Sequence, residues 1–208
     1  VDVGADMPSS KMALELAKQY EFVYAALGVH PSEVEGLTED DMAWISSHAA
    51  HEKVAAIGEI GLDYHWPEPK PALQKQWFRR QIELAKEVKL PIIVHSRDAA
   101  EPTMQIIQKT KAYECGGVIH CYSYSPEMAE EYVKMGFFIG MGGVLTFKNA
   151  KKLVRCAERI PLSSIVLETD CPYMAPEPNR GKRNDSSQLI YVAQKLAEIK
   201  GITAEEVK

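Results

Sequence analysis

The sequence has few cysteines, and none of them are spaced as structural metal ligands would be. The chain has four cysteines in 208 residues, namely Cys115, Cys121, Cys156 and Cys171. No two of them form a CxxC pair, the spacing typical of structural zinc. A chain of this length can bury a sizeable core without disulfide bonds. We therefore expect reduced cysteines and a cytoplasmic protein.

Long apolar runs, a secretory signal and an excess of positive charge are also missing. The apolar run Phe137–Leu145 is much shorter than the ~20 residues that cross a bilayer, so we expect no membrane span. The formal net charge of -5 argues against a broad basic surface that would grip duplex nucleic acid. The opening VDVGADMPSS has neither the basic start nor the apolar stretch of a signal peptide, and it lacks an initiator methionine. This missing methionine suggests a chain that is incomplete at its N-terminus.

The remaining composition, with 46% hydrophobic and 25% charged residues, is typical of one globular domain over residues 1–208. Short β-rich runs alternate with longer stretches of helical period, which predicts βα units around a parallel sheet. The expected strands are Val1–Gly4, Phe22–Leu27, Val54–Gly58, Pro91–Val94, Gly117–Ile119, Phe137–Gly140 and Ile165–Glu168. The expected helices are Lys11–Gln19, Glu39–His51, Leu73–Lys89, Ala99–Tyr113, Pro126–Met135, Lys148–Arg159 and Ser187–Lys200.

Seven strands, each followed by a helix, are one unit short of an eightfold βα barrel. An open doubly wound sheet is the alternative, but no GxGxxG follows the first strand, as dinucleotide-binding sheets of that kind would have. We therefore expect an α/β fold of the TIM-type (β/α)8 barrel, here without its first strand-helix unit.

Histidines and acids follow the expected strands at the points where those strands end: His30, Glu59, His95, His120 and Asp170. In a βα barrel the carboxyl ends of the strands meet on one face, which is where the active site is built. Imidazole nitrogen and carboxylate oxygen suit zinc, manganese and similar divalent ions. A single histidine at a strand end is more often structural, but three of them with two acids indicate a catalytic metal site.

Six motifs occur in a fixed order, and the first five contain these residues. They are GVHP at 28–31, GEIGLDY at 58–64, PIIVHSRDA at 91–99, IHCYS at 119–123, LETDCPY at 167–173 and PEPNRGKRN at 176–184. In order and spacing the set resembles the TatD family of metal-dependent deoxyribonucleases, which belongs to the wider class of amidohydrolase-like barrels. The motifs cover nearly the whole chain, so the resemblance is specific although each motif alone would be weak.

The resemblance implies a site for two divalent metal ions, which could be zinc, manganese or magnesium. Glu59 would bridge the two ions, and His95 and His120 would complete the ligands of the second ion. Asp170 would bind the first ion and serve as general base. These roles are expectations that come from the family.

The sequence departs from the family at one point. In the family the first metal also needs an HxH pair at the end of the first strand, and no HxH occurs in this chain. We expect that the chain begins after the segment that carries this pair. Without that segment, the second site could still form from Glu59, His95 and His120.

Other residues near the motifs are candidates for substrate binding. Arg97 and Arg180 could contact phosphate oxygens, because a guanidinium offers paired donors. Arg180 lies in a loop rich in proline and glycine and could equally be a solvated turn residue. His30 could contact the substrate phosphate or a metal-bound water, and Trp66 could stack on a nucleobase. Asp63 is expected to be a structural hydrogen-bonding residue rather than a ligand.

The resemblance implies hydrolysis of phosphodiester bonds in DNA, and the acidic composition favours single-stranded ends over duplex. No obligate protein partner is implied. Two alternatives remain at this stage. One is a metal-dependent hydrolase of a small phosphoester, ester or amide, because loops rather than the barrel select the substrate. The other is a non-catalytic truncated barrel, supported by the missing HxH pair.

Overall fold

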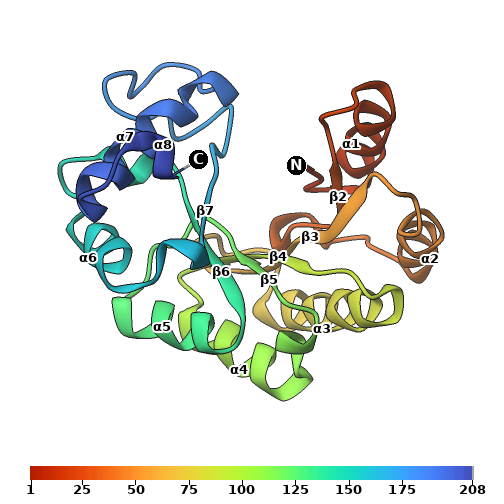
Figure 1. Ribbon diagram of the computed structural model, residues 1–208. Helices are drawn as coiled ribbons and strands as arrows, with labels where there is room; N and C mark the ends of the chain where they lie inside the picture. Colours follow the sequence, from red (N-terminus) through yellow and green to blue (C-terminus); the bar gives the residue numbers. More distant parts are fainter. Residues whose placement is uncertain (208) are drawn as a thin grey trace. The chain divides into compact units, whose positions relative to one another are not determined.

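The computed structural model describes residues 1–207, in which strands and helices alternate along the chain (Figure 1). The strands among these residues are β1 (Asp2–Val3), β2 (Ala25–Leu27), β3 (Val54–Asp63), β4 (Ile92–Arg97), β5 (Gly117–Ile119), β6 (Phe137–Met141) and β7 (Ile165–Leu167). The α-helices are α1 (Met7–Gln19), α2 (Glu39–His48), α3 (Pro71–Val88), α4 (Ala100–Thr110), α5 (Pro126–Lys134), α6 (Lys151–Arg159), α7 (Leu189–Lys200) and α8 (Ala204–Val207). Short 3-10 helices lie at Pro31–Glu33, Ala112–Glu114, Gly143–Thr146, Leu162–Ser164 and Ser186–Gln188.

The chain divides into two compact units. Unit 1 runs from Val1 to Val118, and unit 2 begins at Ile119. The sequence predicted a single domain over residues 1–208, and that expectation stays a prediction.

Unit 1 contains parallel strands that follow one another in sequence order. Strand β1 pairs with β2, β2 with β3, and β3 with β4, all parallel. An open doubly wound sheet would reverse its strand order at a switch point, and the order β1-β2-β3-β4 shows no such reversal. The pairing in unit 1 therefore follows the barrel-type order that the sequence predicts.

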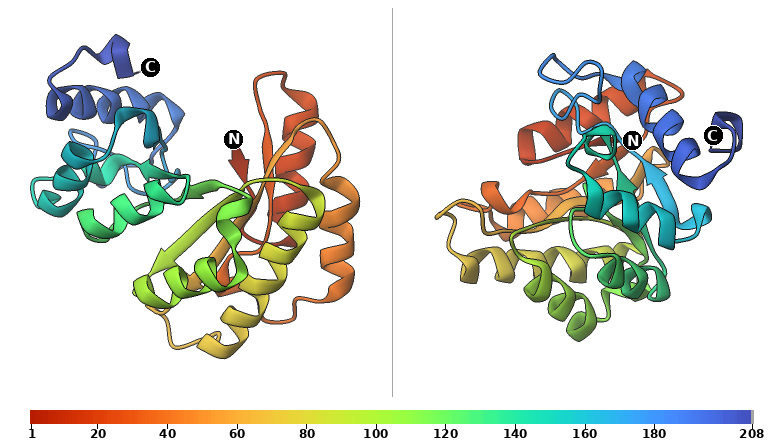
Figure 2. Two further views of the ribbon diagram at one scale, coloured as in Figure 1. Left: turned by 60° about the horizontal axis from the view of Figure 1, so that its bottom comes forward. Right: turned by 90° about the vertical axis from the view of Figure 1, so that its left-hand side faces the viewer.

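Helices α1, α3 and α4 pack on strands β2, β3 and β4 in turn (Figure 2). Helix α1 starts with a capping box, in which the Asp6 side chain accepts a hydrogen bond from the backbone N–H of Ser9. This box satisfies backbone donors that a helix start leaves unpaired. Helix α3 buries an apolar stripe that includes Trp77, Phe78 and Ile82, and the helix packs against β3.

The pairing of β3 with β4 is interrupted around Glu59. The register shifts between Ile57 and Ile60, and after the shift Gly61 lies opposite His95. A Cβ atom added to Gly61, whose φ is +149°, would lie 1.9 Å from the His95 carbonyl oxygen. Only glycine allows the two strands to approach so closely here.

Unit 2 has the parallel pair β6 and β7, with Ile139 opposite Ile165. Helix α5 is capped by the Ser125 side chain, which accepts from the Met128 N–H. It contacts β6 through buried Tyr132, whose ring lies 6.1 Å from that of Phe137. Helices α6 and α7 pack on each other and add their own buried faces.

All seven predicted strands and all seven predicted helices occur, with shifted ends. The largest difference is β3, which was expected to end at Gly58 and continues to Asp63. Local patterns did not reveal this extension, because the segment GEIG at 58–61 has two glycines and a charged residue, which interrupt the apolar run. Helix α8 was not anticipated.

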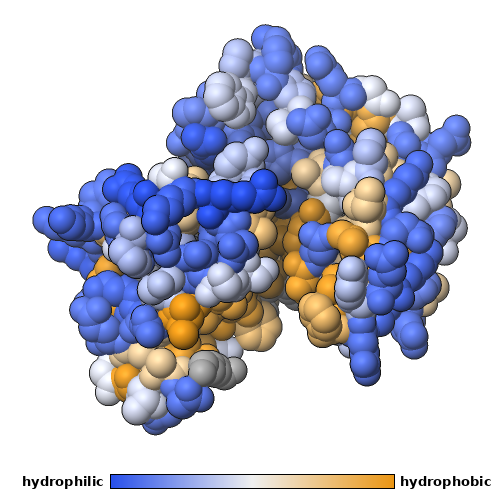
Figure 3. All heavy atoms as spheres, turned by 90° about the horizontal axis from the view of Figure 1, so that it is seen from above, coloured by the Kyte–Doolittle hydropathy of each residue, from blue (hydrophilic) through white to orange (hydrophobic). Residues whose placement is uncertain are grey.

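The surface is largely hydrophilic on the face shown in Figure 3, as a chain with 25% charged residues would lead one to expect. Among residues 1–207, no helix combines the length and the apolar character that crossing a bilayer requires. The cysteine Cys156 is buried, which raises the pKa of its thiol to about 11.

We predict that Gly61→Ala destabilises the protein by roughly 1–3 kcal/mol, the usual cost of overpacking, because its Cβ would collide with the His95 backbone. Chemical denaturation of both proteins measures the difference. Gly36→Ala is the matched control, since Gly36 also has a positive φ, +79°, but has nothing within 4 Å of an added Cβ. A loss for Gly61→Ala no larger than the loss for Gly36→Ala would show that close approach to β4 is not the constraint.

Candidate metal centre

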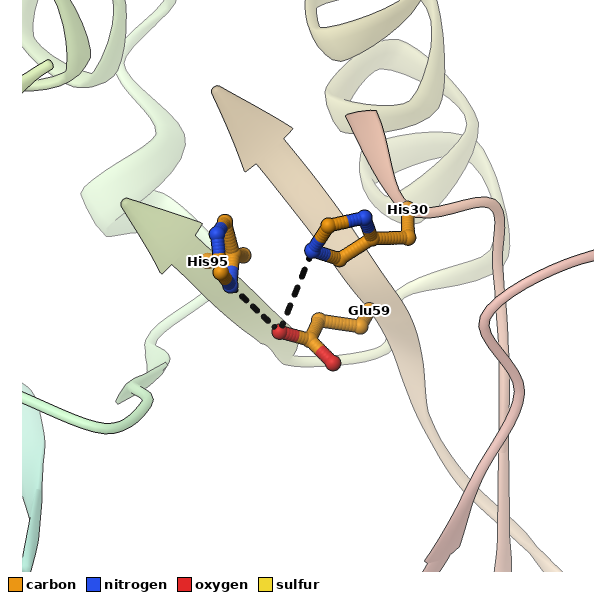
Figure 4. Close-up of side chains that lie close together, drawn as sticks. All are labelled: His30, Glu59 and His95. Atoms are coloured by element: carbon orange, nitrogen blue, oxygen red, sulfur yellow. Dashed lines mark hydrogen bonds and ion pairs between the residues drawn. The ribbon is translucent and has the colours of Figure 1, made fainter. Parts of the chain in front are cut away.

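Three side chains of unit 1 form a compact cluster of possible ligands: His30, Glu59 and His95. Figure 4 shows both imidazole rings directed toward the Glu59 carboxylate. Glu59 Oε1 lies 2.8 Å from His95 Nδ1 and 4.0 Å from His30 Nε2. The three ligand atoms all lie within 4.8 Å of one another, so one ion could engage all three after small shifts.

Backbone contacts explain why these side chains meet. Glu59 lies in the register shift of β3, and an irregularity of this kind redirects a side chain. The Glu59 N–H donates to the Gly4 carbonyl at 2.9 Å, and the His30 N–H donates to the Ala5 carbonyl at 2.8 Å. Two adjacent peptides after β1 thus hold the backbones of two cluster residues. His95 comes from β4, where it pairs with Gly61.

His95 lies between two carboxylates. Its Nδ1 faces Glu59 at 2.8 Å and its Nε2 faces Asp63 Oδ2 at 3.2 Å. Burial opposes the charged imidazolium, but the hydrogen bonds to Asp63 and Glu59 outweigh it and raise the pKa of His95. Burial likewise opposes the Asp63 carboxylate, yet the hydrogen bonds from His95 and the His65 N–H lower the pKa of Asp63. Both shifts favour a protonated His95 in the metal-free chain.

Unit 2 holds a second cluster, formed by His120, Cys121 and Asp170. His120 Nε2 lies 3.3 Å from Asp170 Oδ1. On its other side, His120 Nδ1 lies 2.7 Å from Glu168 Oε2, while Glu168 Oε1 accepts from the Cys121 N–H at 2.7 Å. The contact with Glu168 is the shorter of the two and is the one that counts as a hydrogen bond, which favours a hydrogen on Nδ1 and makes Nε2 the nitrogen that could bind a metal.

The chemistry of both clusters fits a divalent cation. Imidazole nitrogen and carboxylate oxygen are ligands of zinc, and carboxylates also suit manganese and magnesium. In unit 2, the Glu168 contact with His120 is the type of outer hydrogen bond that orients metal-bound histidines. Glu59 and His95 lie together in unit 1, and His120 and Asp170 lie together in unit 2.

The remaining predicted site residues lie at strand ends or in loops. Arg97 is the last residue of β4 and is exposed. Arg180 is exposed in the loop that precedes α7, with its guanidinium 4.3 Å from the centre of the Phe147 ring. His30 was expected to contact substrate, and the structure places it in the ligand cluster of unit 1. The roles of all these residues stay predictions.

Sequence reasoning missed two residues of unit 2, Glu168 and Cys121. Glu168 was treated only as the end of a strand, although it is an acidic residue of the motif LETDCPY, two positions before Asp170. Cys121 was treated only as a reduced thiol, and its position next to His120 was the available signal. Asp63 makes the hydrogen bonds that were expected of a structural residue.

Fold and site together define a class of protein: an α/β protein with parallel strands whose ends carry histidine and carboxylate clusters suited to divalent metals. Barrel enzymes place their catalytic residues at such strand ends. The family model described as TatD related DNase matches residues 1–208. The chain belongs to the TatD family, as its motifs indicated.

Several relatives are named as metal-dependent hydrolases or TatD homologues. The chain is 49% identical over 207 residues to the uncharacterized metal-dependent hydrolase YabD of Bacillus subtilis, covering 100% of this chain and 81% of YabD. It is similar to the crystal structure of the TatD homologue YJJV from Escherichia coli, with 32% identity, a TM-score of 0.91 and coverage of 99% and 80% of the two chains. A TatD family hydrolase structure from Entamoeba histolytica matches with a TM-score of 0.85 at 23% identity, covering 99% of this chain and 79% of that one. These matches confirm the expected α/β fold of the TIM-barrel type.

We predict that Glu168→Gln changes the tautomer of His120. A glutamine offers one acceptor where the carboxylate offers two, so it cannot satisfy both the Cys121 N–H and the His120 Nδ1–H. We expect His120 to move its hydrogen partly to Nε2, which NMR of the histidine ring nitrogens detects. Glu158→Gln, an exposed change in the same unit, is the control. An unchanged Nδ1–H tautomer in Glu168→Gln would contradict the assignment.

Proposed function

We propose that the protein is a metal-dependent hydrolase that cleaves phosphodiester bonds of DNA, with preference for single-stranded ends. The observation that carries this proposal is the cluster of His30, Glu59 and His95, whose ligand atoms lie within 4.8 Å of one another. Membership in the TatD related DNase family supports DNA as the substrate. The net charge of -5 supports single-stranded DNA as substrate, because binding to many phosphates of a duplex requires a broad basic surface.

The proposed ligands are Glu59 and His95 in unit 1, and His120 and Asp170 in unit 2. His30 supplies a further nitrogen beside Glu59. A divalent ion supplies Lewis acidity when bound, which neutralises charge on a phosphate and makes water a better nucleophile. Zinc, manganese and magnesium are the candidates, with two ions per complete site.

The other proposed roles belong to groups that can move a proton or contact phosphate. Asp170 has a side chain that is 33% exposed and serves as general base by taking a proton from the attacking water. Arg97 and Arg180 donate paired hydrogen bonds to phosphate oxygens, which stabilises the charge that grows as the bond breaks. A cytoplasmic location and the absence of an obligate protein partner stay predictions.

We predict that Glu59→Gln abolishes most of the activity while the fold persists, because the change keeps the shape of the side chain and removes its charge. Hydrolysis of single-stranded DNA with Mn²⁺ should fall by more than about 100-fold, the upper end of losses seen when only an outer partner of a ligand is removed. Glu52→Gln is the matched control, since Glu52 is exposed just before β3. Equal activity in Glu59→Gln and wild type would overturn the proposal.

A substrate panel separates DNA from small substrates. Wild-type protein with Mn²⁺ should cleave single-stranded oligonucleotides faster than duplex DNA and faster than bis(p-nitrophenyl) phosphate. Cleavage of the small phosphodiester alone would replace DNA by a small phosphoester as the substrate class. No hydrolysis of any substrate by metal-loaded protein would leave a non-catalytic barrel and contradict the proposal.

Metal binding should weaken as the pH falls. The neighbouring carboxylates raise the pKa of His95, so protons compete with metal up to a pH above its ordinary value of roughly 6.5. Affinity for Mn²⁺ should therefore be full above the raised pKa and decline as the pH falls through it. Calorimetric titration in buffers of different ionisation enthalpy should also show proton release. Binding that is independent of pH and releases no proton would show that His95 is not a ligand.

A further inference from the structure

Helix α3 carries two buried glutamines on the side that faces the strands. Gln74 and Gln81 are each only 1% exposed. They lie seven residues apart, about two helical turns, and therefore on the same face. A buried amide is costly unless its donors and acceptor are all paired. Apolar side chains fill most of the rest of this face, so the two amides call for a specific explanation.

The Gln81 side chain forms hydrogen bonds with both backbone polar groups of a single residue, Val29. Its Oε1 accepts from the Val29 N–H at 2.8 Å, and its Nε2 donates to the Val29 carbonyl at 3.1 Å. Val29 is buried and lies beyond the end of β2, immediately before His30. The two bonds resemble those of a neighbouring strand and hold the backbone from which His30 projects.

Gln74 repeats this arrangement at the end of β3. Its Oε1 accepts from the Asp63 N–H at 2.8 Å, and its Nε2 donates to the Asp63 carbonyl at 2.8 Å and to the Pro69 carbonyl at 2.8 Å. Asp63 in turn faces His95 through its side chain. Helix α3 therefore holds the backbone of Val29, which precedes His30, and the backbone of Asp63, whose side chain contacts His95.

We propose that Gln74 and Gln81 are positioning residues that make α3 the support of the metal cluster in unit 1. Gln81 sets the backbone that carries His30, and Gln74 sets the backbone of Asp63 and through it the ring of His95. Two bonds to one residue fix the rotation of its peptide groups as well as their position, which a single contact or apolar packing does not do. This proposal rests on the proposed function, because it concerns the metal-binding role of the same cluster.

The test replaces each amide by a side chain of similar length that cannot form these bonds. The variants are Gln81→Met, Gln74→Met and, as matched control, Gln76→Met, because Gln76 is exposed on the same helix. Mn²⁺ affinity is measured by calorimetry on the full chain, and the visible absorption spectrum of the Co²⁺ form reports ligand geometry. Both are recorded well below the unfolding temperature of each variant.

We expect Gln81→Met and Gln74→Met to bind Mn²⁺ about tenfold more weakly, at the lower end for groups that orient metal ligands. Their Co²⁺ spectra should also change, while Gln76→Met matches wild type in both. Lower unfolding temperatures with unchanged Mn²⁺ affinity and Co²⁺ spectra would show that the glutamines only stabilise the fold, which overturns the proposal.

Two further results keep the test decisive. If wild-type protein binds no Mn²⁺ or Co²⁺, the proposed function fails before the variants are compared; if wild type binds and the variants bind equally, only the positioning role fails. If a methionine variant does not fold, the positioning role is tested instead by measuring amide hydrogen exchange in the wild-type protein. Val29 and Asp63 N–H groups protected as strongly as the interior of β3 support the proposal, and rapid exchange at both overturns it.

Discussion

The close approach of β3 to β4 around Glu59 is the constraint on which the rest of unit 1 depends. At Gly61 there is no room for a Cβ beside the His95 carbonyl, and a Cβ on Gly58 would lie 2.6 Å from Ile93 Cβ. The register shift between Ile57 and Ile60 contains Glu59, whose carboxylate faces His30 and His95. The backbone geometry of β3 therefore determines which side chains the Glu59 carboxylate meets.

Polar groups near the clusters are paired in a way that leaves their geometry little freedom. Carboxylates face both nitrogens of His95 and both nitrogens of His120. Such pairing is costly to break in a partly buried setting, where an unpaired polar group loses its water without replacement. In each unit a histidine is therefore oriented before any metal arrives, and the energy needed to arrange the ligands is already provided by folding.

Much of the fold and part of the site could be predicted from local patterns. Hydrophobic runs located every strand, and Glu59, His95, His120 and Asp170 were found because histidines and acids at or just beyond the ends of apolar runs are conspicuous. The register shift in β3 could not be predicted, because it involves the pairing with β4 and the bond to the Gly4 carbonyl, which lie far from the segment in sequence. The role of Gln81 was equally hidden, since its partner Val29 lies 52 positions away and a glutamine in a helix looks like a surface residue.

Direct observation of the ligands in the metal-loaded protein tests the central claim, that strand-end histidines and carboxylates hold a divalent ion. X-ray absorption at the zinc edge of the zinc-loaded chain reports the atoms around the metal. We predict nitrogen and oxygen neighbours at about 2.0–2.2 Å with the outer-shell scattering of imidazole rings. A shell of oxygen alone without imidazole scattering, or a shell made only of sulfur at about 2.3 Å, would contradict the claim.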